Sequence, residues 1–421
     1  MVALGTRHII GGGLAGLAAA ERLARHGARV ELYEAAPGLG GRCRSFFDAA
    51  LDAELDNGSH VLIRANTAVV DLLHRAGVER PFTALPAVPM IDLRDGTRFA
   101  LPKRHGPAPF WLLAPGRIVP GACRADGWRA LAAMARPTND ATVTDAFGGC
   151  GALYNKLLEP LALAILNTPA ERASAALFVK TMRLATTGPA RRGDLLVFRQ
   201  PFASGMIGPL ERHLRTQGVT LHTGMRLEAL HSDADRIVAL QFRQQRIALS
   251  DDDHVILAVP QGPAAGLLPD LQTPAATQAI VNGHFRLPDG GVAATPLTGL
   301  IGGSGQWLFQ RDGIASVTVS AADDLAAQDA GVIARLLWHD AAQALGLPPG
   351  PLPAHRIVKE KRATFAQTPA GLARRPGANT RYRNLTLAGD WTATGLPATL
   401  EGAVRSGRHA AARALQRRQR N

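Results

Sequence analysis

Near its start, the chain combines short apolar runs and glycines in an order that predicts a strand, a helix and a second strand. The apolar run at residues 8–10 leads directly into the glycine-rich segment 11–16. Apolar residues then recur at helical spacing, at Leu14, Leu17, Ala20, Leu23 and Ala24. Gly27 is suited to end that helix, and residues 28–34 alternate as a second strand would. We therefore expect a βαβ unit here.

The glycines of this unit have the GxGxxG spacing of a dinucleotide-binding turn, at Gly11, Gly13 and Gly16. In such a turn the first glycine permits the bend and the second lets a pyrophosphate approach the backbone. The third lets the helix pack closely on the strand. The free N–H groups of the first helical turn, at Leu14 and Ala15, would then face the phosphates.

The residues after the second strand indicate which dinucleotide is bound. Glu34 ends that strand, where a carboxylate accepts hydrogen bonds from ribose hydroxyls and disfavours the 2′-phosphate of NADP. We assign Ala35, the next residue, to the same part of the site. A further glycine pair then precedes Arg42, and NAD has no need of it. Because Gly41 keeps the backbone open and Arg42 can hold phosphate oxygens with two hydrogen bonds, this loop favours a longer dinucleotide.

A segment near the C-terminus has the features of the other half of an FAD site. Residues 385–390 predict a buried strand that ends in Gly389 and Asp390, and the carboxylate would accept a ribityl hydroxyl. A helix is expected from about Thr399. Its first N–H groups, at Thr399 and Leu400, would face the pyrimidine edge of a flavin and stabilise negative charge there. We interpret Glu401 as a favourable acid in the first turn.

Together these motifs resemble the amine oxidase/phytoene desaturase superfamily of FAD enzymes. Six longer segments extend the comparison over nearly the whole chain: LYEAAPGLGGRCRSFFD (32–48), LDNGSHVLIRAN (55–66), ILNTPAERASAALF (165–178), GLIGGSGQWLF (299–309), KRATFAQTPAG (361–371) and LAGDWTATGLPATLEGAVRSG (387–407). They resemble the hydroxysqualene dehydroxylase family within that superfamily. Ser59 is a departure, because that family is expected to have Asn there.

The resemblance implies non-covalent FAD and two further cofactor contacts, at Gly58 and Leu227. In similar enzymes the backbone at the position of Leu227 contacts the adenine side, although a core leucine explains this residue equally well. The expected fold class is α/β, with a Rossmann-like FAD-binding domain and a discontinuous α+β substrate domain. We assign residues 1–65, 205–265 and 355–421 to the FAD-binding domain. Residues 66–204 and 266–354 are assigned to the substrate domain.

Hydrophobic patterns between the two ends predict further elements. In the FAD-binding domain we expect a helix at 205–217 and strands at 219–223, 227–230, 237–242 and 254–259. In the substrate domain we expect a Pro-rich loop at 101–109 and a helical stretch at 171–184. Strands at 299–301, 307–310 and 315–320 would form a sheet that walls the substrate pocket.

The resemblance implies that the protein reduces hydroxysqualene, a C30 isoprenoid alcohol, to squalene in squalene and hopanoid biosynthesis. The substrate loses its hydroxyl as water and takes a hydride from reduced flavin. That reaction needs a long apolar tunnel and one proton donor. Our candidate for a catalytic residue is His60, which follows a strand expected to approach the flavin and which titrates near working pH. The interpretation that we favour for this residue is a histidine that organises its loop by hydrogen bonding.

Several other residues near these motifs are assigned no chemistry. Asp56 is expected to orient a backbone group or Arg42. Lys359 and Lys361 fit solvated strand ends, and nothing marks Cys43 as an activated thiol that would link a flavin. The apolar residues of 157–184 either line the tunnel or belong to an ordinary core. No metal ligands are predicted.

Composition restricts the partners and the compartment. The formal net charge of +13 comes almost entirely from Arg, which fits either codon bias or a basic surface that contacts anionic lipid. Scattered Arg and few aromatics argue against nucleic-acid binding. The three cysteines have no CxxC spacing, and no signal peptide or membrane span is apparent, so we expect a cytoplasmic protein, peripheral on the inner face of the cytoplasmic membrane. The oligomeric state stays open.

Three other functions are considered. A carotenoid or polyene desaturase would move the hydride in the opposite direction. An amine oxidase would need an aromatic cage and a polar amine site, which an aromatic content of 5% supports poorly. A non-enzymatic FAD-fold protein that carries lipid is the third.

Overall fold

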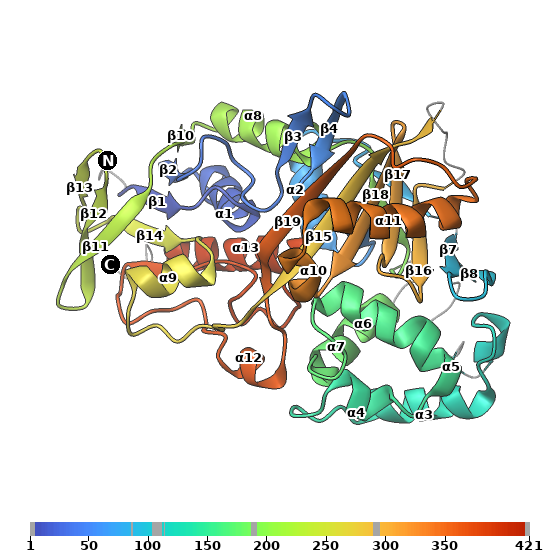
Figure 1. The fold of residues 1–421 in the computed structure, drawn as a ribbon. Coiled ribbons are helices and arrows are strands. Elements are labelled where there is room, and N and C mark those ends of the chain that lie inside the picture. Colours follow the sequence, from blue (N-terminus) through green and yellow to red (C-terminus); the bar gives the residue numbers. More distant parts are fainter. Residues whose placement is uncertain are drawn as a thin grey trace.

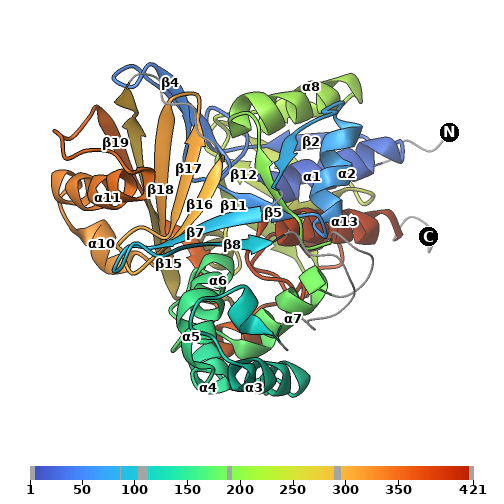
Figure 2. The same cartoon turned by 90° about the vertical axis from the view of Figure 1, so that its right-hand side faces the viewer.

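A computed structural model of the protein describes residues 5–85, 87–102, 112, 114–186, 192–288 and 295–416. Figures 1 and 2 show three parts in space: a parallel sheet with helices packed against it, a larger sheet beside it, and a group of helices next to the larger sheet. The expected α/β class is confirmed.

The first part is built on a five-stranded parallel sheet in the order β10–β2–β1–β14–β20. Its strands are β1 (Arg7–Ile10), β2 (Val30–Tyr33), β10 (Thr220–His222), β14 (His254–Leu257) and β20 (Leu385–Leu387). They are short and mostly buried on both faces, as parallel strands covered on both sides are. The five strands expected from the apolar runs are therefore confirmed, and they come from all three chain segments assigned to the FAD-binding domain.

Helices cover one face of this sheet: α1 (Leu14–Arg25), α2 (Thr67–Arg75), α8 (Gly208–Thr216) and α13 (Leu400–Gln416). Two glycines permit unusually close packing there. A Cβ on Gly16 would lie 1.9 Å from the carbonyl oxygen of Gly11, and a Cβ on Gly407 would lie 1.9 Å from that of Ala15. Because only glycine fits at both positions, α1 sits directly on the turn after β1 and α13 directly on α1.

An antiparallel layer covers the other face. It consists of β11 (Leu227–Asp233), β12 (Arg236–Phe242) and β13 (Arg246–Ala248), with α9 (Gln261–Leu267) and the short α12 (Pro369–Ala373) nearby. Leu227, Ile237 and Phe242 pack against β1, β2 and β14 from this layer. The strand β13 was not among the expected strands.

The second part is a seven-stranded sheet in the order β19–β15–β18–β17–β16–β7–β8. Its strands are β7 (Ala87–Asp92), β8 (Arg98–Pro102), β15 (Thr277–Arg286), β16 (Leu297–Ile301), β17 (Trp307–Arg311), β18 (Ile314–Ser320) and β19 (His355–Phe365). Helices α10 (Asp323–Ala327) and α11 (Ala330–Leu345) cover one face (Figure 1). The strands expected around residues 299–320 are confirmed. β19 pairs in this sheet, although its residues begin the third segment assigned to the FAD-binding domain.

Short strands connect the two sheets. β3 (Ser45–Asp48) and β4 (Ala53–Asp56) form a hairpin, and β9 (Leu195–Phe198) pairs with both β5 (Val61–Ile63) and β6 (Phe82–Ala84). The loop between β4 and β5, which contains His60, therefore lies between the two larger sheets.

The third part is helical and comprises α3 (Arg124–Ala135), α4 (Val143–Phe147), α5 (Gly151–Leu153), α6 (Glu159–Leu166) and α7 (Ala175–Thr186), with 3-10 and π-helical segments at Pro115–Arg117 and Tyr154–Leu158. Another π-helical segment, Ala203–Ile207, leads into α8. The helix expected from residue 171 begins only at Ala175, where the Ser174 hydroxyl accepts from the Leu177 N–H at 3.3 Å. Of the expected loop at 101–109, the first two residues end β8. The remainder, like the tail 417–421, lies outside the described residues.

Candidate active site

Two glycine-rich loops meet at the N-terminus of α1. Gly13 and Gly40 form a parallel bridge, and the Gly40 N–H donates to the Gly12 carbonyl at 2.9 Å. Gly40 and Gly41 have φ angles of 105° and 59°, in the region that favours glycine. The first predicted cofactor turn and the second predicted cofactor loop are thus one continuous backbone surface.

This surface fits the phosphate part of a dinucleotide. No side chain caps the first turn of α1, and a Cβ on Gly13 would have no neighbour within 4 Å among the described residues. Free N–H groups and open space are what a pyrophosphate requires. Glu34 lies beside the turn, because its carboxylate accepts from the N–H groups of Gly12 and Ala36, each at 2.7 Å.

Arg42 connects the beginning of the chain to its end. Its guanidinium donates to the Asp390 carboxylate at 2.7 Å and to the Ala363 carbonyl at 2.5 Å. The charge of Asp390 raises the pKa of Arg42, and the Asp390 side chain is only 7% exposed. Sequence reasoning placed each group against the cofactor separately, whereas the structure pairs them with each other. Their contacts with phosphate and ribityl groups stay predictions.

The N-terminus of α13 carries Thr399, Leu400 and Glu401. The Thr399 hydroxyl accepts from the Gly402 N–H at 3.2 Å, which caps this turn. The Glu401 carboxylate is buried, pairs with Arg405 at 2.7 Å, and accepts from the N–H groups of Ala68 and Val69 at the start of α2. Glu401 therefore caps a second helix as well as lying in its own first turn. The sequence could not indicate this contact, because it joins residues 333 positions apart.

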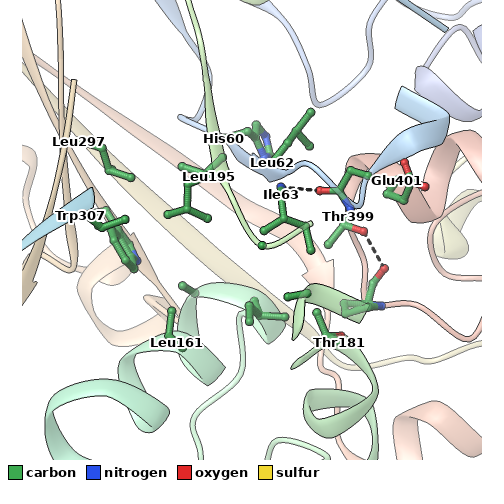
Figure 3. A pocket seen from close by; sticks show the side chains of 18 of the residues that line it. His60, Leu62, Ile63, Leu161, Thr181, Leu195, Leu297, Trp307, Thr399 and Glu401 are labelled. Atoms are coloured by element: carbon green, nitrogen blue, oxygen red, sulfur yellow. Dashed lines mark hydrogen bonds between the residues drawn. The ribbon is translucent and has the colours of Figure 1, made fainter. Parts of the chain in front are cut away.

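An apolar cavity of about 430 Å³ lies next to these residues. At one end it is bounded by Gly58, Ser59, His60, Thr399 and Glu401. Leu297 and Trp307, from β16 and β17, lie across the cavity from Thr399 and Glu401 (Figure 3). The expectation that these strands wall the pocket is therefore confirmed.

The helical part closes the cavity from another side and answers a question that the sequence left open. From segment 157–184, the residues Leu157, Leu161, Ala164, Ile165, Thr181, Met182 and Leu184 line the cavity. Ala162, Leu166 and Phe178 point instead into the core of the helical part. The segment has both roles, since opposite sides of its helices face the cavity and the core.

His60 lies in the cavity wall, with its ring centroid 5.2 Å from that of Phe202. Burial lowers the pKa of His60 to about 4, and the charge of Arg42 acts in the same direction, while Asp56 opposes them. The imidazole is therefore neutral near pH 7. It makes no hydrogen bond with any described residue, so the favoured interpretation of a hydrogen-bonded, loop-organising histidine finds no support in this geometry.

Asp56 organises the loop instead. Its carboxylate accepts from the Phe202 N–H at 2.8 Å, from Ser45 at 2.7 Å and from Arg311 at 2.9 Å. The expectation of a backbone partner is confirmed. The charged partner is Arg311 and not Arg42, a difference that the sequence could not show because β17 reaches this loop only through the tertiary fold.

Comparison with known proteins identifies the family. The family model described as flavin containing amine oxidoreductase matches residues 14–415. A hydroxysqualene dehydroxylase of Rhodopseudomonas palustris is 40% identical over 410 residues, which cover 96% of this chain and 97% of that protein. One of Sinorhizobium fredii is 40% identical over 97% of this chain and 98% of its own length. The chain belongs to the hydroxysqualene dehydroxylase family.

The fold is shared more widely than the sequence. Cyclohexylamine oxidase of Brevibacterium oxydans superposes on the chain with a TM-score of 0.68 at 17% identity, and the match covers 99% of this chain and all of that one. At that identity the likeness shows the fold alone: a Rossmann-like FAD-binding domain with a substrate domain. Membership of a flavin-containing family implies that FAD is the cofactor of this protein.

The other residues that the sequence singled out do not line the cavity. Cys43 is buried, which raises the pKa of its thiol to about 12, so the structure gives no sign of an activated cysteine. Lys359 and Lys361 lie on β19 and do not line the cavity, and Leu227 is buried at the start of β11. Among the described residues no group of His, Cys, Asp or Glu could hold a metal ion. Of the helices that the structure describes, none combines the length and apolar character needed to cross a bilayer.

We predict that Gly13→Asp protein loses most of its FAD, because a carboxylate would enter the open space where phosphates are expected and repel them. Gly262→Asp is a matched control, since that glycine also has no neighbour within 4 Å but lies on α9. The measurement is the ratio of flavin absorbance to protein after purification. Full flavin content in the Gly13 variant would contradict the assignment of this turn.

Proposed function

We propose that the protein is an FAD-dependent hydroxysqualene dehydroxylase that converts hydroxysqualene to squalene. The observation that carries the proposal is the apolar cavity that ends at the loop of His60 and the N-terminus of α13, in a chain similar over its full length to hydroxysqualene dehydroxylases. A hydrocarbon substrate with a single polar group requires such a cavity.

Bound, reduced FAD would supply the hydride that replaces the hydroxyl group. The residues of the chain would bind and position the cofactor. Gly11, Gly13 and Gly16 would admit the phosphates to the start of α1, and Glu34 would hold the adenosine ribose. Arg42 and Asp390 would position the remaining part of FAD through the ion pair that joins the two ends of the chain. We also propose that FAD is held without a covalent bond, because the thiol of Cys43 is buried and stays protonated.

The cavity itself would exclude water and hold the hydrocarbon. Its acids are already engaged: Asp194 pairs with Arg64 at 3.4 Å, and Glu401 caps α2. An amine substrate would want an available carboxylate, so this lining favours a neutral substrate over an amine. His60, in the cavity wall, is a titratable group that makes no hydrogen bond with a described residue. We propose it as the proton donor.

The decisive measurement is an anaerobic assay with chemically reduced protein. We expect hydroxysqualene to re-oxidise the bound flavin, visible in its absorbance, and squalene to form in equal amount. A flavin that stays reduced with hydroxysqualene, in a protein that in its oxidised form is reduced by a carotenoid precursor, would instead indicate a polyene desaturase.

Protonation of His60 should make the reaction depend on pH. Because its pKa is lowered to about 4, the protonated fraction should fall tenfold per pH unit above that value. If the imidazolium gives the proton, kcat/KM should decrease as pH rises from about 5 to 8, since kcat/KM reports the free enzyme. His60→Gln should lower kcat/KM roughly 100-fold and remove this slope.

The exposed His74 on α2 provides the matched control, because His74→Gln should keep both the rate and the slope. A slope that persists in His60→Gln protein would exclude His60 as the donor.

We propose further that the protein is cytoplasmic and binds the membrane from the inner face through α3. Trp128 on this helix is 62% exposed, and Arg124 and Arg129 are exposed beside it. The opposite side of α3, at Ala130 and Met134, packs into the helical core whose inner helices line the cavity. An exposed Trp flanked by Arg suits the headgroup region of an anionic bilayer. The net charge of +13 acts in the same direction.

We expect the protein to sediment with vesicles that contain phosphatidylglycerol and to do so less with phosphatidylcholine alone. Replacement of Arg124 and Arg129 by Gln should weaken binding by about 1 kcal/mol each, roughly fivefold per residue. Trp128→Ala should weaken it too, whereas Phe47→Ala should not, although Phe47 is 66% exposed on the β3–β4 hairpin. Equal binding by all variants would exclude α3 as the contact.

A further inference from the structure

A second cavity, of about 470 Å³, lies against the first and differs from it in character. The two share Ser59, His60 and Phe309 in their walls. Around the second cavity stand charged and polar groups from several elements: Asp52, Glu54, Asp56, Arg199, His284, Arg311, Asp312 and Ser316. Since a cavity with many polar partners holds water and an apolar one does not, we name them the polar compartment and the apolar compartment.

One face of the large sheet runs through both compartments. Along β17, Trp307 lines the apolar compartment, Phe309 lines both, and Arg311 lines the polar one. Along β18, Thr318 faces the apolar compartment and Ser316 the polar one. Residues two apart on a strand share a face, so these side chains form a single continuous surface.

The loop Asn57–His60 crosses this surface where its character changes. Asn282, on β15, pairs across strands with Thr318 and accepts from its hydroxyl at 2.7 Å. The side-chain amide of Asn282 donates to the Asn57 carbonyl at 3.1 Å. Asn282 is wholly buried, so these bonds fasten the loop to the sheet in the absence of competing water. We call Asn57–His60 the partition loop.

One contact holds the partition loop from the polar compartment: Arg311 pairs with Asp56, directly before the loop, at 2.9 Å. Beside it, His284 on β15 shares a hydrogen bond with Ser316 on β18 at 2.8 Å, within the sheet itself. The partition loop therefore has fixed polar anchors on the sheet, and its Ser59 and His60 remain as the residues common to both compartments.

The proposed reaction makes demands that the apolar compartment alone does not meet. The C–O bond of the substrate breaks, the carbon takes a hydride from reduced flavin, and the departing oxygen takes a proton and leaves as water. Each turnover thus consumes one proton and releases one water molecule inside an apolar cavity. Both are costly to move through hydrocarbon surroundings.

We propose that the polar compartment is the water side of this active site: the proton enters and the water leaves past Ser59 and His60. The inference rests on the proposed function for its chemistry, and on the partition loop for its geometry. In this arrangement His60 passes a proton from water in the polar compartment to the substrate oxygen. The lowered pKa of His60 agrees with a group that transfers a proton and does not store one.

The test is cysteine accessibility in the FAD-loaded protein. The starting protein is Cys123→Ser, because Cys123 is exposed while Cys43 and Cys150 are buried. Into it are introduced, separately, His60→Cys and Trp307→Cys. The probes are a cationic methanethiosulfonate, which an apolar cavity excludes, and the neutral N-ethylmaleimide, each with and without saturating squalene.

We expect the cationic probe to modify the His60→Cys protein, with and without squalene, at rates that differ by less than about twofold. The Trp307→Cys protein should react only with the neutral probe, and squalene should slow that reaction at least about tenfold. Exclusion of the cationic probe from position 60, or loss of its reaction when squalene is bound, would overturn the proposal.

A variant that fills the polar compartment tests whether access of water to residue 60 limits the rate of reaction. Ser316→Phe should occupy the polar compartment, slow cationic labelling at position 60 about tenfold, and slow re-oxidation of reduced flavin by hydroxysqualene to a similar degree. Squalene affinity should not change. Thr83→Phe, on β6, should fill the same compartment. This variant is used instead if the Ser316→Phe protein lacks FAD. Filling without effect on either rate would contradict the inference.

These outcomes separate the two proposals. If hydroxysqualene never re-oxidises the flavin, the proposed function fails, whatever the labelling pattern. If it does, but residue 60 is closed to the cationic probe, the proposed function stands and the water side is not the polar compartment.

Discussion

The close approach of α1 to the turn after β1 and of α13 to α1 is the constraint on which the rest of the structure depends. Gly16 and Gly407 leave no room for a side chain against Gly11 and Ala15, so the first and last helices are held at backbone contact. A parallel sheet brings the carboxyl ends of its strands to one edge. With the helices fixed this tightly, the turn after β1 and the segment after β20 meet at that edge, where Gly13 bridges Gly40 and Arg42 pairs with Asp390.

Ion pairs and charged hydrogen bonds then hold together the chain segments that the packing brings into contact. Arg42 and Asp390 lie 348 positions apart in the chain and are joined at 2.7 Å. Glu401 caps α2 from α13 in a similar way. A buried charge without its partner is strongly destabilising, so such pairs tolerate few other arrangements of the chain. They add specificity to a contact whose strength comes mainly from the apolar core around α1 and α13.

The substrate side depends on the period of a β-strand. Because alternate residues face the same way, β15, β17 and β18 each present one continuous surface, and the character of that surface changes from Trp307 to Arg311 over a single strand. The loop of His60 lies across this change because Asn282 and Arg311 hold it there. The proposed reaction needs an apolar site for the hydrocarbon and a proton for the departing oxygen. A loop between an apolar and a polar compartment can provide both.

The sequence by itself determined the elements at the two ends of the chain and the class of cofactor. Short apolar runs, GxGxxG and Glu34 are local patterns, and local patterns suffice to predict a βαβ unit, a final strand before Asp390 and a helix from Thr399. Hydrophobic patterns extended this to the strands around residues 299–320 that wall the cavity. They did not reveal β13, β15 or α11.

Only the tertiary structure decided which of these residues meet. It paired Asp56 with Arg311 in place of Arg42, gave Glu401 a second helix to cap, and divided the segment 157–184 between cavity and core. It also placed His60 at the boundary between two compartments, where burial lowers its pKa to about 4. The physical reason is the same in each case: hydrogen bonds, ion pairs and desolvation depend on distance in space, and in these contacts that distance is set by segments far apart in the chain.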